Sequence, residues 1–283
     1  MKDGNRPDLK INLKIIGKEI SSFKVKNLAK IKKFLKKNEL DDLIIDEVKG
    51  FTDDDAVPDK PKKPKSKLGE IYQLGHHRVM CGDATKEEDV KKMINACEHD
   101  IDIYCSNVGI GAYEDFLKLS NEQWRKMIDT NLMSHIYGVR HVLQQMLDRG
   151  SGYFVFTASA AGLLSQLGSV TYSVTKHAVV SLAEWLKITY GKAGIGVSCI
   201  CPQAVRTAMT AQGAGVAGID GMIEPEVVAN DTLEAIENDQ FLVTPHKQVR
   251  EYIQFKAADY EGWIEGMQKL QDSFIEEINS AIK

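Results

Sequence analysis

The chain has 283 residues and a mass of 31.5 kDa, which is enough for one large domain or for one domain with an appendage. Its hydrophobic content of 43% and charged content of 27% are those of an ordinary globular protein. The net charge of -4 is divided unevenly, because residues 1–70 carry 18 Lys and Arg against 13 Asp and Glu, whereas the remainder carries 18 against 27. This asymmetry predicts two segments of different origin, and it is too small to indicate a nucleic-acid-binding protein.

Cysteine and histidine spacing and hydropathy argue against a disulfide scaffold, a zinc-finger-like metal site and a membrane-spanning protein. Five cysteines are an odd number and too sparse for a disulfide scaffold, so we expect reduced thiols and a cytoplasmic location. Cys199 and Cys201 lie two apart in GVSCICP, share one sheet face and are predicted to fill the core. His76, His77 and Cys81 have no second ligand pair at zinc-finger spacing, so no metal site is expected. No stretch approaches the ~20 apolar residues of a membrane span, and the first ten residues have no apolar signal core.

Residues 8–50 are predicted to form a small strand–helix–strand unit, with apolar residues spaced three to four apart in VKNLAKIKKFLKKN. The seven lysines between Lys24 and Lys37 are interpreted as a solvated helix face, with phosphate contact as the alternative. Residues 51–67, FTDDDAVPDKPKKPKSK, combine prolines, acids and lysines with little to bury, which is typical of a linker. We therefore place a boundary near residue 68, between a unit of residues 1–67 and a domain of residues 68–283.

After the boundary, strands and helices alternate. The segment EIYQLGHHRVMCGDA predicts a strand pair, and TKEEDVKKMINA a helix with Thr85 as its N-cap. The strand DIDIYCSN follows, then a long helix from a cap at Ser120 to a glycine stop at Gly150. The later predicted elements are the strand GYFVFTAS, a helix at about 172–190, the strand GIGVSCICP, the helix EPEVVANDTLEAIE, the strand QFLVTP and a C-terminal helix. This alternation indicates an α/β fold with a parallel sheet covered by helices on both faces.

Three side chains carry the chemistry that the sequence predicts. Tyr172 and Lys176 are four residues apart in a helix, so both project from one face. An ammonium beside a phenol favours the phenolate, which predicts a lowered pKa for Tyr172 and proton exchange near neutral pH. Ser159 lies thirteen residues before Tyr172, where an apolar strand meets small residues. Taken singly, each has a plainer interpretation: a turn serine, a half-buried helix tyrosine and an exposed lysine.

The spacing Ser–x12–Tyr–x3–Lys resembles the active site of the short-chain dehydrogenase/reductase family, and the resemblance runs from about residue 78 to the C-terminus. It implies a Rossmann-like, doubly wound parallel sheet. It also implies that Tyr172 exchanges a proton with a carbonyl oxygen, that Ser159 orients this carbonyl, and that Lys176 lowers the tyrosine pKa and holds the nicotinamide ribose. The segment DTNLMSH places Asn131 where the family has the asparagine of its proton relay.

The same resemblance implies which residues contact the cofactor. The segment CGDATKEEDV looks like the family's strand-end aspartate segment, and CSNVGIG resembles its Asn-Asn-Ala-Gly segment with valine in place of alanine. CPQAVRTAM resembles its Pro-Gly-x-Val-x-Thr segment, in which Gln203 replaces the glycine. The implied contacts with NAD or NADP are, besides Tyr172 and Lys176, Asp83 near the adenine, Asn107, Gly109, Pro202, Val205 and Thr207. Residues 208–222, rich in glycine and alanine, correspond to the family's substrate lid and indicate a mobile, apolar flap.

The family's glycine-rich phosphate loop is not found before residue 78, although its backbone amides normally meet the pyrophosphate. The first strand–helix–strand of the fold is therefore absent or replaced by an atypical N-terminal unit. Residues 50–92 resemble instead the join between a ParB-like domain and the methylase of phage-type DNA methyltransferases. No Asp-Pro-Pro-Tyr or Asn-Pro-Pro-Tyr occurs, so this resemblance brings no catalytic loop. The sequence thus has the character of a chimeric junction.

These observations predict an oxidoreductase that transfers a hydride between NAD(P) and an apolar secondary alcohol or ketone, with impaired cofactor binding. An inactive scaffold is the alternative, because helices 121–149 and 172–190 resemble those with which the family builds dimers, and we expect a homo-oligomer. A DNA-modifying protein ranks last. We expect no membrane partner and no nucleic-acid partner.

Overall fold

The computed structural model describes residues 63–211 and 213–282, so the predicted unit at 8–50 lies outside the described residues. Four parallel strands form one sheet in the order β3 (Ile103–Ser106), β4 (Gly152–Thr157), β5 (Ile195–Ile200) and β6 (Leu242–Val243). The predicted strands thus pair in parallel, with Ser106 opposite Phe156 and Thr157 opposite Ile200. Parallel strands need crossover connections, and here each crossover contains a helix.

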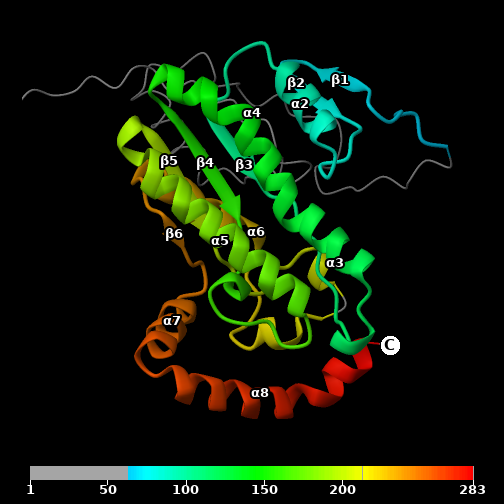
Figure 1. The fold of residues 1–283 in the computed structure, drawn as a ribbon, viewed down its shortest axis with the longest axis vertical. Helices are drawn as coiled ribbons and strands as arrows, with labels where there is room; N and C mark the ends of the chain where they lie inside the picture. Colours follow the sequence, from blue (N-terminus) through cyan, green and yellow to red (C-terminus); the bar gives the residue numbers. More distant parts are fainter. Residues whose placement is uncertain (1–62, 212, 283) are drawn as a thin grey trace, which may run out of the picture.

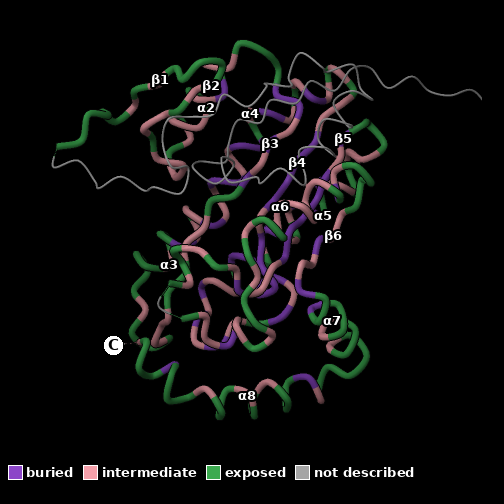
Figure 2. Tube along the Cα trace, turned by 180° about the vertical axis from the view of Figure 1, so that it is seen from behind, coloured by how far each residue is buried: buried purple, intermediate pink, exposed green. Residues whose placement is uncertain are grey.

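The sheet is covered on both faces, as the alternation predicts (Figure 1). Phe154 and Phe156 of β4 point to the face packed by α4 (Ser134–Arg149) and α5 (Val170–Tyr190), in the larger apolar cluster. Tyr153 and Val155, the alternate residues, point to the face packed by α6 (Pro225–Glu237). Figure 2 shows the buried residues concentrated along these strands. The predicted Rossmann-like α/β arrangement is therefore confirmed.

A separate hairpin precedes this sheet. The predicted strand pair is confirmed as β1 (Ile71–Leu74) antiparallel to β2 (His77–Met80). In the described residues these strands pair only with each other, so Asp83 follows a hairpin strand and not a strand of the parallel sheet. The predicted order of strand, aspartate and helix is therefore present, with the strand in a hairpin, and a contact of Asp83 with the adenine stays a prediction.

The N-cap predicted at Thr85 is wrong. Helix α2 (Glu87–Asn95) begins after Lys86, which makes no side-chain capping bond. The Thr85 hydroxyl and amide instead donate to the Asp83 carboxylate, at 2.7 and 3.0 Å. Asp83 closes this turn locally, and these hydrogen bonds lower its pKa.

The predicted helix between Ser120 and Gly150 is confirmed at both ends. Ser120 and Gln123 form a capping box at the start of α3 (Asn121–Ile128), and Gly150 ends α4 with φ of 70°. Between them, η4 (Asp129–Met133) is a π-helical turn that the periodicity did not reveal. Such turns are frequent at functional sites, and this one contains the buried Asn131.

The carboxyl ends of β4 and β5 point toward the lid segment and the C-terminal helices (Figure 1). The predicted C-terminal helix is two helices, α7 (Gln248–Ala258) and α8 (Tyr260–Ala281), separated at Asp259, whose carboxylate accepts from the amide of Gly262. Val216 of the lid packs with Leu167 and with Ile278 of α8 in a third apolar cluster. Among the helices of the described ranges, none combines the length and apolar character needed to span a membrane.

Candidate active site

The carboxyl ends of β4 and β5 and the first turns of α5 meet at one place. Ser159 follows β4, and its hydroxyl caps a short 3-10 turn by accepting from the amide of Ala161 at 3.1 Å. The same hydroxyl lies 3.4 Å from the carbonyl oxygen of Pro202, which follows β5. The fold therefore brings together Ser159, Tyr172 and Lys176, which the sequence places on a strand end and on a helix.

Lys176 is buried, with 3% of its surface exposed. Its Nζ donates to the carbonyl oxygen of Thr157 at 2.8 Å and lies 5.6 Å from the centroid of the Tyr172 ring. Burial lowers the pKa of Lys176 from 10.5 to about 8. The plainer interpretation of Lys176 as an exposed helix lysine is therefore wrong.

The pKa of Tyr172 is shifted in the direction opposite to the lowering that we expected from the neighbouring Lys176. Burial raises the pKa of Tyr172, and a hydrogen bond with Ser159 offsets only part of this increase. Our expectation of a lowered value is wrong for the free protein, because removal from water disfavours the phenolate more than its surroundings favour it. In the free protein the phenol is therefore a protonated donor within reach of Ser159.

Asn131 is fully buried and connects two segments with its amide group. Its Oδ1 accepts from the amide of Ile110 at 2.8 Å, and its Nδ2 donates to the carbonyl of Ile110 at 2.9 Å and to Oγ1 of Thr175 at 3.1 Å. Thr175 precedes Lys176 on α5. Asn131 thus holds the loop after β3 against the helix that carries Tyr172 and Lys176.

Of the two predicted cofactor residues after β3, Gly109 lies beside the lysine. A Cβ atom on Gly109 would stand 3.1 Å from Nζ of Lys176 and 3.8 Å from Oδ1 of Asn131. A Cβ atom on Gly111 would stand 3.5 Å from the Tyr172 ring, an ordinary contact. Asn107 is exposed. This turn therefore faces the lysine and the tyrosine at close range.

The predicted residues after β5 lie beside Ser159 and at the root of the lid. Pro202 contributes its carbonyl to the amide of Ala160 at 2.8 Å, and Val205 bridges to Ile223, where the lid returns. Thr207 caps a short 3-10 turn together with Thr210. The structure brings Pro202 next to Ser159, while Asp83 lies apart in the turn between β2 and α2.

Glu114 is a structural residue of this site that sequence reasoning missed. The first turn of α5 lacks a capping side chain from its own N-cap, Ser169. The Glu114 carboxylate accepts there from the amide of Thr171 at 3.1 Å and from the Thr171 hydroxyl. A carboxylate at a helix N-terminus is favourable, and Thr171 is adjacent to Tyr172. The 57-residue separation leaves no local signal by which this pair could be found.

We expect Glu114→Ala to lower the free energy of unfolding by about 1–2 kcal/mol, because the first turn of α5 loses its only described cap. Glu114→Gln keeps an acceptor and the packing, so it should lose less than half of that amount. Urea unfolding of both variants measures the effect. Equal stability of Glu114→Ala and the unmodified protein would contradict the capping role.

Comparison with known proteins agrees with this geometry. A family model described as short chain dehydrogenase matches residues 55–214, which is more than half of the chain. The chain belongs to the short-chain dehydrogenase family. No comparison bears on the second resemblance, that of residues 50–92 to a DNA methyltransferase, which stays a prediction.

Two curated members of the family show how much of the chain is shared. A mitochondrial borneol dehydrogenase of Lavandula x intermedia is 32% identical over 169 residues, 57% of this chain and 64% of that protein. The oxidoreductase UcpA of Escherichia coli K12 is 31% identical over 173 residues, 61% of this chain and 64% of that protein. The family member described here therefore spans just under two thirds of the length of these relatives.

Solved structures of the family show the same fold. A short-chain dehydrogenase/reductase of Burkholderia phymatum, solved in complex with NAD, superposes with a TM-score of 0.56 at 26% identity, covering 65% of this chain and 76% of that one. A short-chain dehydrogenase of Novosphingobium aromaticivorans gives a TM-score of 0.54 at 24% identity, covering 75% of this chain and 82% of that one. The similarity to the Novosphingobium aromaticivorans structure concerns the fold alone.

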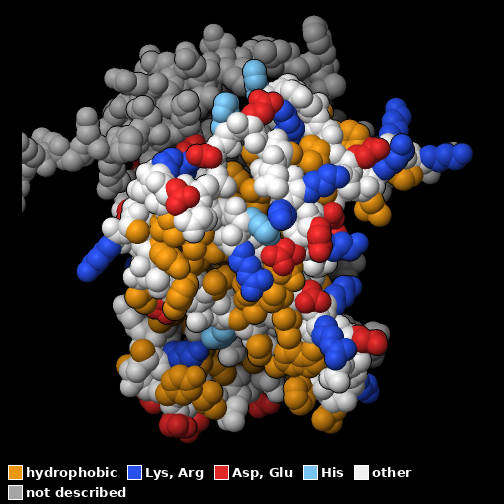
Figure 3. Space-filling view, turned by 45° about the horizontal axis from the view of Figure 1, so that its top comes forward, with side chains coloured by type: hydrophobic (Ala, Val, Ile, Leu, Met, Phe, Trp, Pro, Cys, Tyr) orange, Lys and Arg blue, Asp and Glu red, His pale blue; other side chains and the backbone are white. Residues whose placement is uncertain are grey.

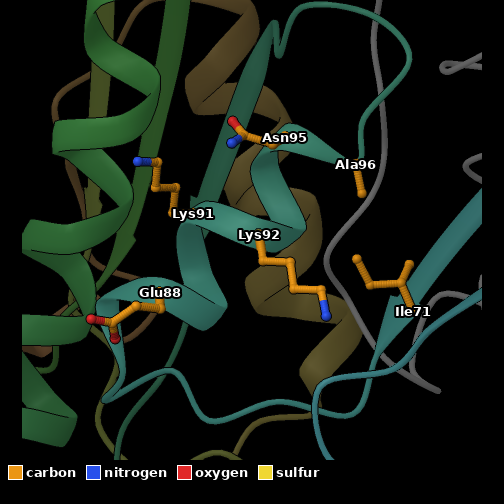
Figure 4. A pocket seen from close by; sticks show the side chains of 6 residues that line it. All are labelled: Ile71, Glu88, Lys91, Lys92, Asn95 and Ala96. Atoms are coloured by element: carbon orange, nitrogen blue, oxygen red, sulfur yellow. The ribbon is translucent and has the colours of Figure 1, made fainter.

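An open pocket of about 520 Å³ lies away from this site, between α2 and β1 (Figure 4). Its lining residues are Ile71, Glu88, Lys91, Lys92, Asn95 and Ala96. Figure 1 places α2 and β1 at the end of the molecule opposite to α7, α8 and the lid. The pocket mixes both charges with short apolar side chains, and none of the predicted site residues lines it.

Proposed function

We propose that the protein is an NAD(P)-dependent oxidoreductase of the short-chain type, acting on an apolar secondary alcohol or ketone. The observation that carries this proposal is the grouping of a buried ammonium, a phenol and a serine hydroxyl around the ends of β4 and β5. In open α/β sheets, ligands bind beyond the carboxyl ends of the strands. The small, apolar composition of the lid, residues 208–222, favours an apolar substrate.

In this proposal Tyr172 is the acid for carbonyl reduction and the base for alcohol oxidation. Ser159, within hydrogen-bonding reach of the phenol, orients the substrate oxygen. Lys176 places a positive charge behind the ring and stabilises the phenolate when the proton leaves. Asn131 fixes the loop opposite Lys176, and its tie to Thr175 keeps the two helices in register.

The residues present fit the nicotinamide end of the cofactor, which supplies or accepts the hydride when bound. Gly109 leaves room beside the ammonium that a side chain would occupy. Asn107, Pro202, Val205 and Thr207, with Tyr172 and Lys176, would hold this end, and Asp83 the adenine end. The sequence has no glycine-rich loop for the pyrophosphate, and each missing charge-assisted hydrogen bond costs about 1.5–3 kcal/mol. We therefore expect weak binding, without a stated preference between NAD and NADP.

A calorimetric titration with NADH and NADPH, followed by turnover assays on apolar secondary alcohols and ketones, tests the proposal. We expect saturable binding that Gly109→Ala weakens about tenfold, because its Cβ would press on Nζ of Lys176 at 3.1 Å. Gly111→Ala is the matched control, since its Cβ meets only an ordinary contact. Millimolar or weaker binding without turnover would favour the scaffold alternative.

The surface of α5 supports a homo-oligomer as part of this proposal. Val174, Trp185 and Ile188 expose 49%, 55% and 77% of their surfaces. Figure 3 shows hydrophobic side chains gathered on this side of the molecule, among lysines, arginines and acidic residues. Exposed apolar patches of this kind favour association with a second copy. Sedimentation of the protein and of Ile188→Glu would show whether this face is used.

A further inference from the structure

We propose that His135, which the proposed reaction leaves without a role, is a positioning residue for the turn Asn107–Gly109. It ties the last residue of β3 to helix α4, directly behind the lysine of the candidate site. The inference rests on the proposed function only for its consequence, which is cofactor binding. The tie itself is a property of the free protein.

His135 is fully buried, and its Nδ1 lies 2.5 Å from Oγ of Ser106. Ser106 is the last residue of β3 and is buried as well. Burial raises the pKa of Tyr104, two residues earlier on β3, to about 12. The buried bond between Ser106 and His135 therefore links β3 to α4. Buried polar contacts of this kind fix the relative position of the elements that they join.

Two side chains tether the two ends of the turn. Asn131 lies in the π-helical turn η4 and His135 in α4, and both reach the segment that follows β3. His135 holds Ser106 at the beginning of the turn, and Asn131 holds Ile110 at its end. Gly109 lies between these tethers and faces Nζ of Lys176. The distance between the turn and the lysine is thus set by one side chain of η4 and one of α4.

His135 performs this role as a neutral ring. Burial and the nearby charge of Lys176 lower the pKa of His135 to about 3, while the backbone of Val108 opposes this shift. The ring also packs against Phe156, with centroids 6.0 Å apart. Its Nε2 is buried without a hydrogen bond to the described residues. The bond at Nδ1 and the approach of the Val108 backbone are therefore the polar interactions that orient the ring.

Two substitutions separate the bond from the packing. The side chain of His135→Asn carries its polar atoms at the level of Nδ1 and can still bond Ser106. The side chain of His135→Gln carries them one carbon further, at the level of Nε2, and leaves Ser106 without this partner. Ser106→Ala removes the same bond from the other side. Loss of one partner of a buried hydrogen bond corresponds to about 1–3 kcal/mol, hence to roughly fivefold or more in a local opening equilibrium.

The experiment is amide hydrogen exchange on the free protein, followed at Ile110. The amide of Ala158, which donates to Ile200 at 2.9 Å in the sheet, serves as the reference for global opening. We expect Ile110 to exchange about tenfold faster relative to Ala158 in His135→Gln and Ser106→Ala, and at the original rate in His135→Asn. The double variant His135→Gln/Ser106→Ala should exchange no faster than either single variant. Equal rates in the Asn and Gln variants, whether raised or not, would overturn the proposal.

Cofactor titration of the same variants gives the functional consequence. The dissociation constant for NADH should rise in His135→Gln and be restored in His135→Asn. If the unmodified protein binds no nicotinamide nucleotide, the proposed function fails, whereas the exchange result still decides whether His135 positions the turn. Accelerated exchange with unchanged cofactor affinity would overturn the link between this turn and binding.

Discussion

Tyr172→Phe is expected to reduce kcat/KM by about 10²–10⁴-fold, the range contributed by a positioned acid or base. The substitution removes one oxygen and keeps the ring, so Lys176 retains its position 5.6 Å from the ring centroid. The phenol is partly enclosed and its pKa is raised, so its proton remains available for transfer to a carbonyl oxygen over the neutral range. Initial rates with a ketone and NADPH or NADH measure the effect.

The controls for Tyr172→Phe are its free energy of unfolding and its affinity for the cofactor, which show whether the fold and the binding site are retained. Urea unfolding of Tyr172→Phe should change by no more than about 1 kcal/mol, because only the hydrogen bond to Ser159 is lost. Ser159→Ala, which removes the partner of that bond, should also lower the rate and leave the phenol in place. Turnover that survives in Tyr172→Phe would remove the proposed mechanism.

Lys176→Met is expected to abolish turnover and to leave the protein at least as stable as before at pH 7. The ammonium is buried, and lowering its pKa from 10.5 to about 8 corresponds to roughly 3 kcal/mol of unfavourable burial. A methionine has a similar length and no charge. It leaves the carbonyl of Thr157 without the lysine as its partner, which offsets about 1 kcal/mol of the gain.

The pH dependence gives this prediction its sign. Below pH 8 the lysine is protonated in both the folded and the unfolded chain, so the full penalty of burial is present. Between pH 8 and 10.5 the folded protein loses the proton first, and the penalty decreases as the pH rises. The stability advantage of Lys176→Met should therefore shrink from pH 7 to pH 10 in urea unfolding. The burial argument would be contradicted if Lys176→Met were less stable than the unmodified protein at pH 7 and if this difference in stability did not change with pH.

The local patterns predicted most of the secondary structure because they depend on short-range chemistry. The cap at Ser120 and the glycine stop at Gly150 lie at the ends of the helical segment that begins with α3 and closes with α4. The alternation of Phe154 and Phe156 with Tyr153 and Val155 matches the two covered faces of the sheet. The N-cap predicted at Thr85 was wrong because the turn between β2 and α2 uses the Thr85 hydroxyl to bond Asp83.

Residue order was enough to predict the family, the α/β alternation and the spacing that puts Tyr172 and Lys176 on one helical face. These features follow from helix periodicity and from residue order, and both can be recognised from residues that are close together in the sequence. The folded chain was needed to show that Lys176 is buried, that the pKa of Tyr172 is raised, and that Glu114 and His135 contact the segments around the site. Such properties depend on removal from water and on contacts between residues that are up to 57 positions apart, and a linear pattern contains neither.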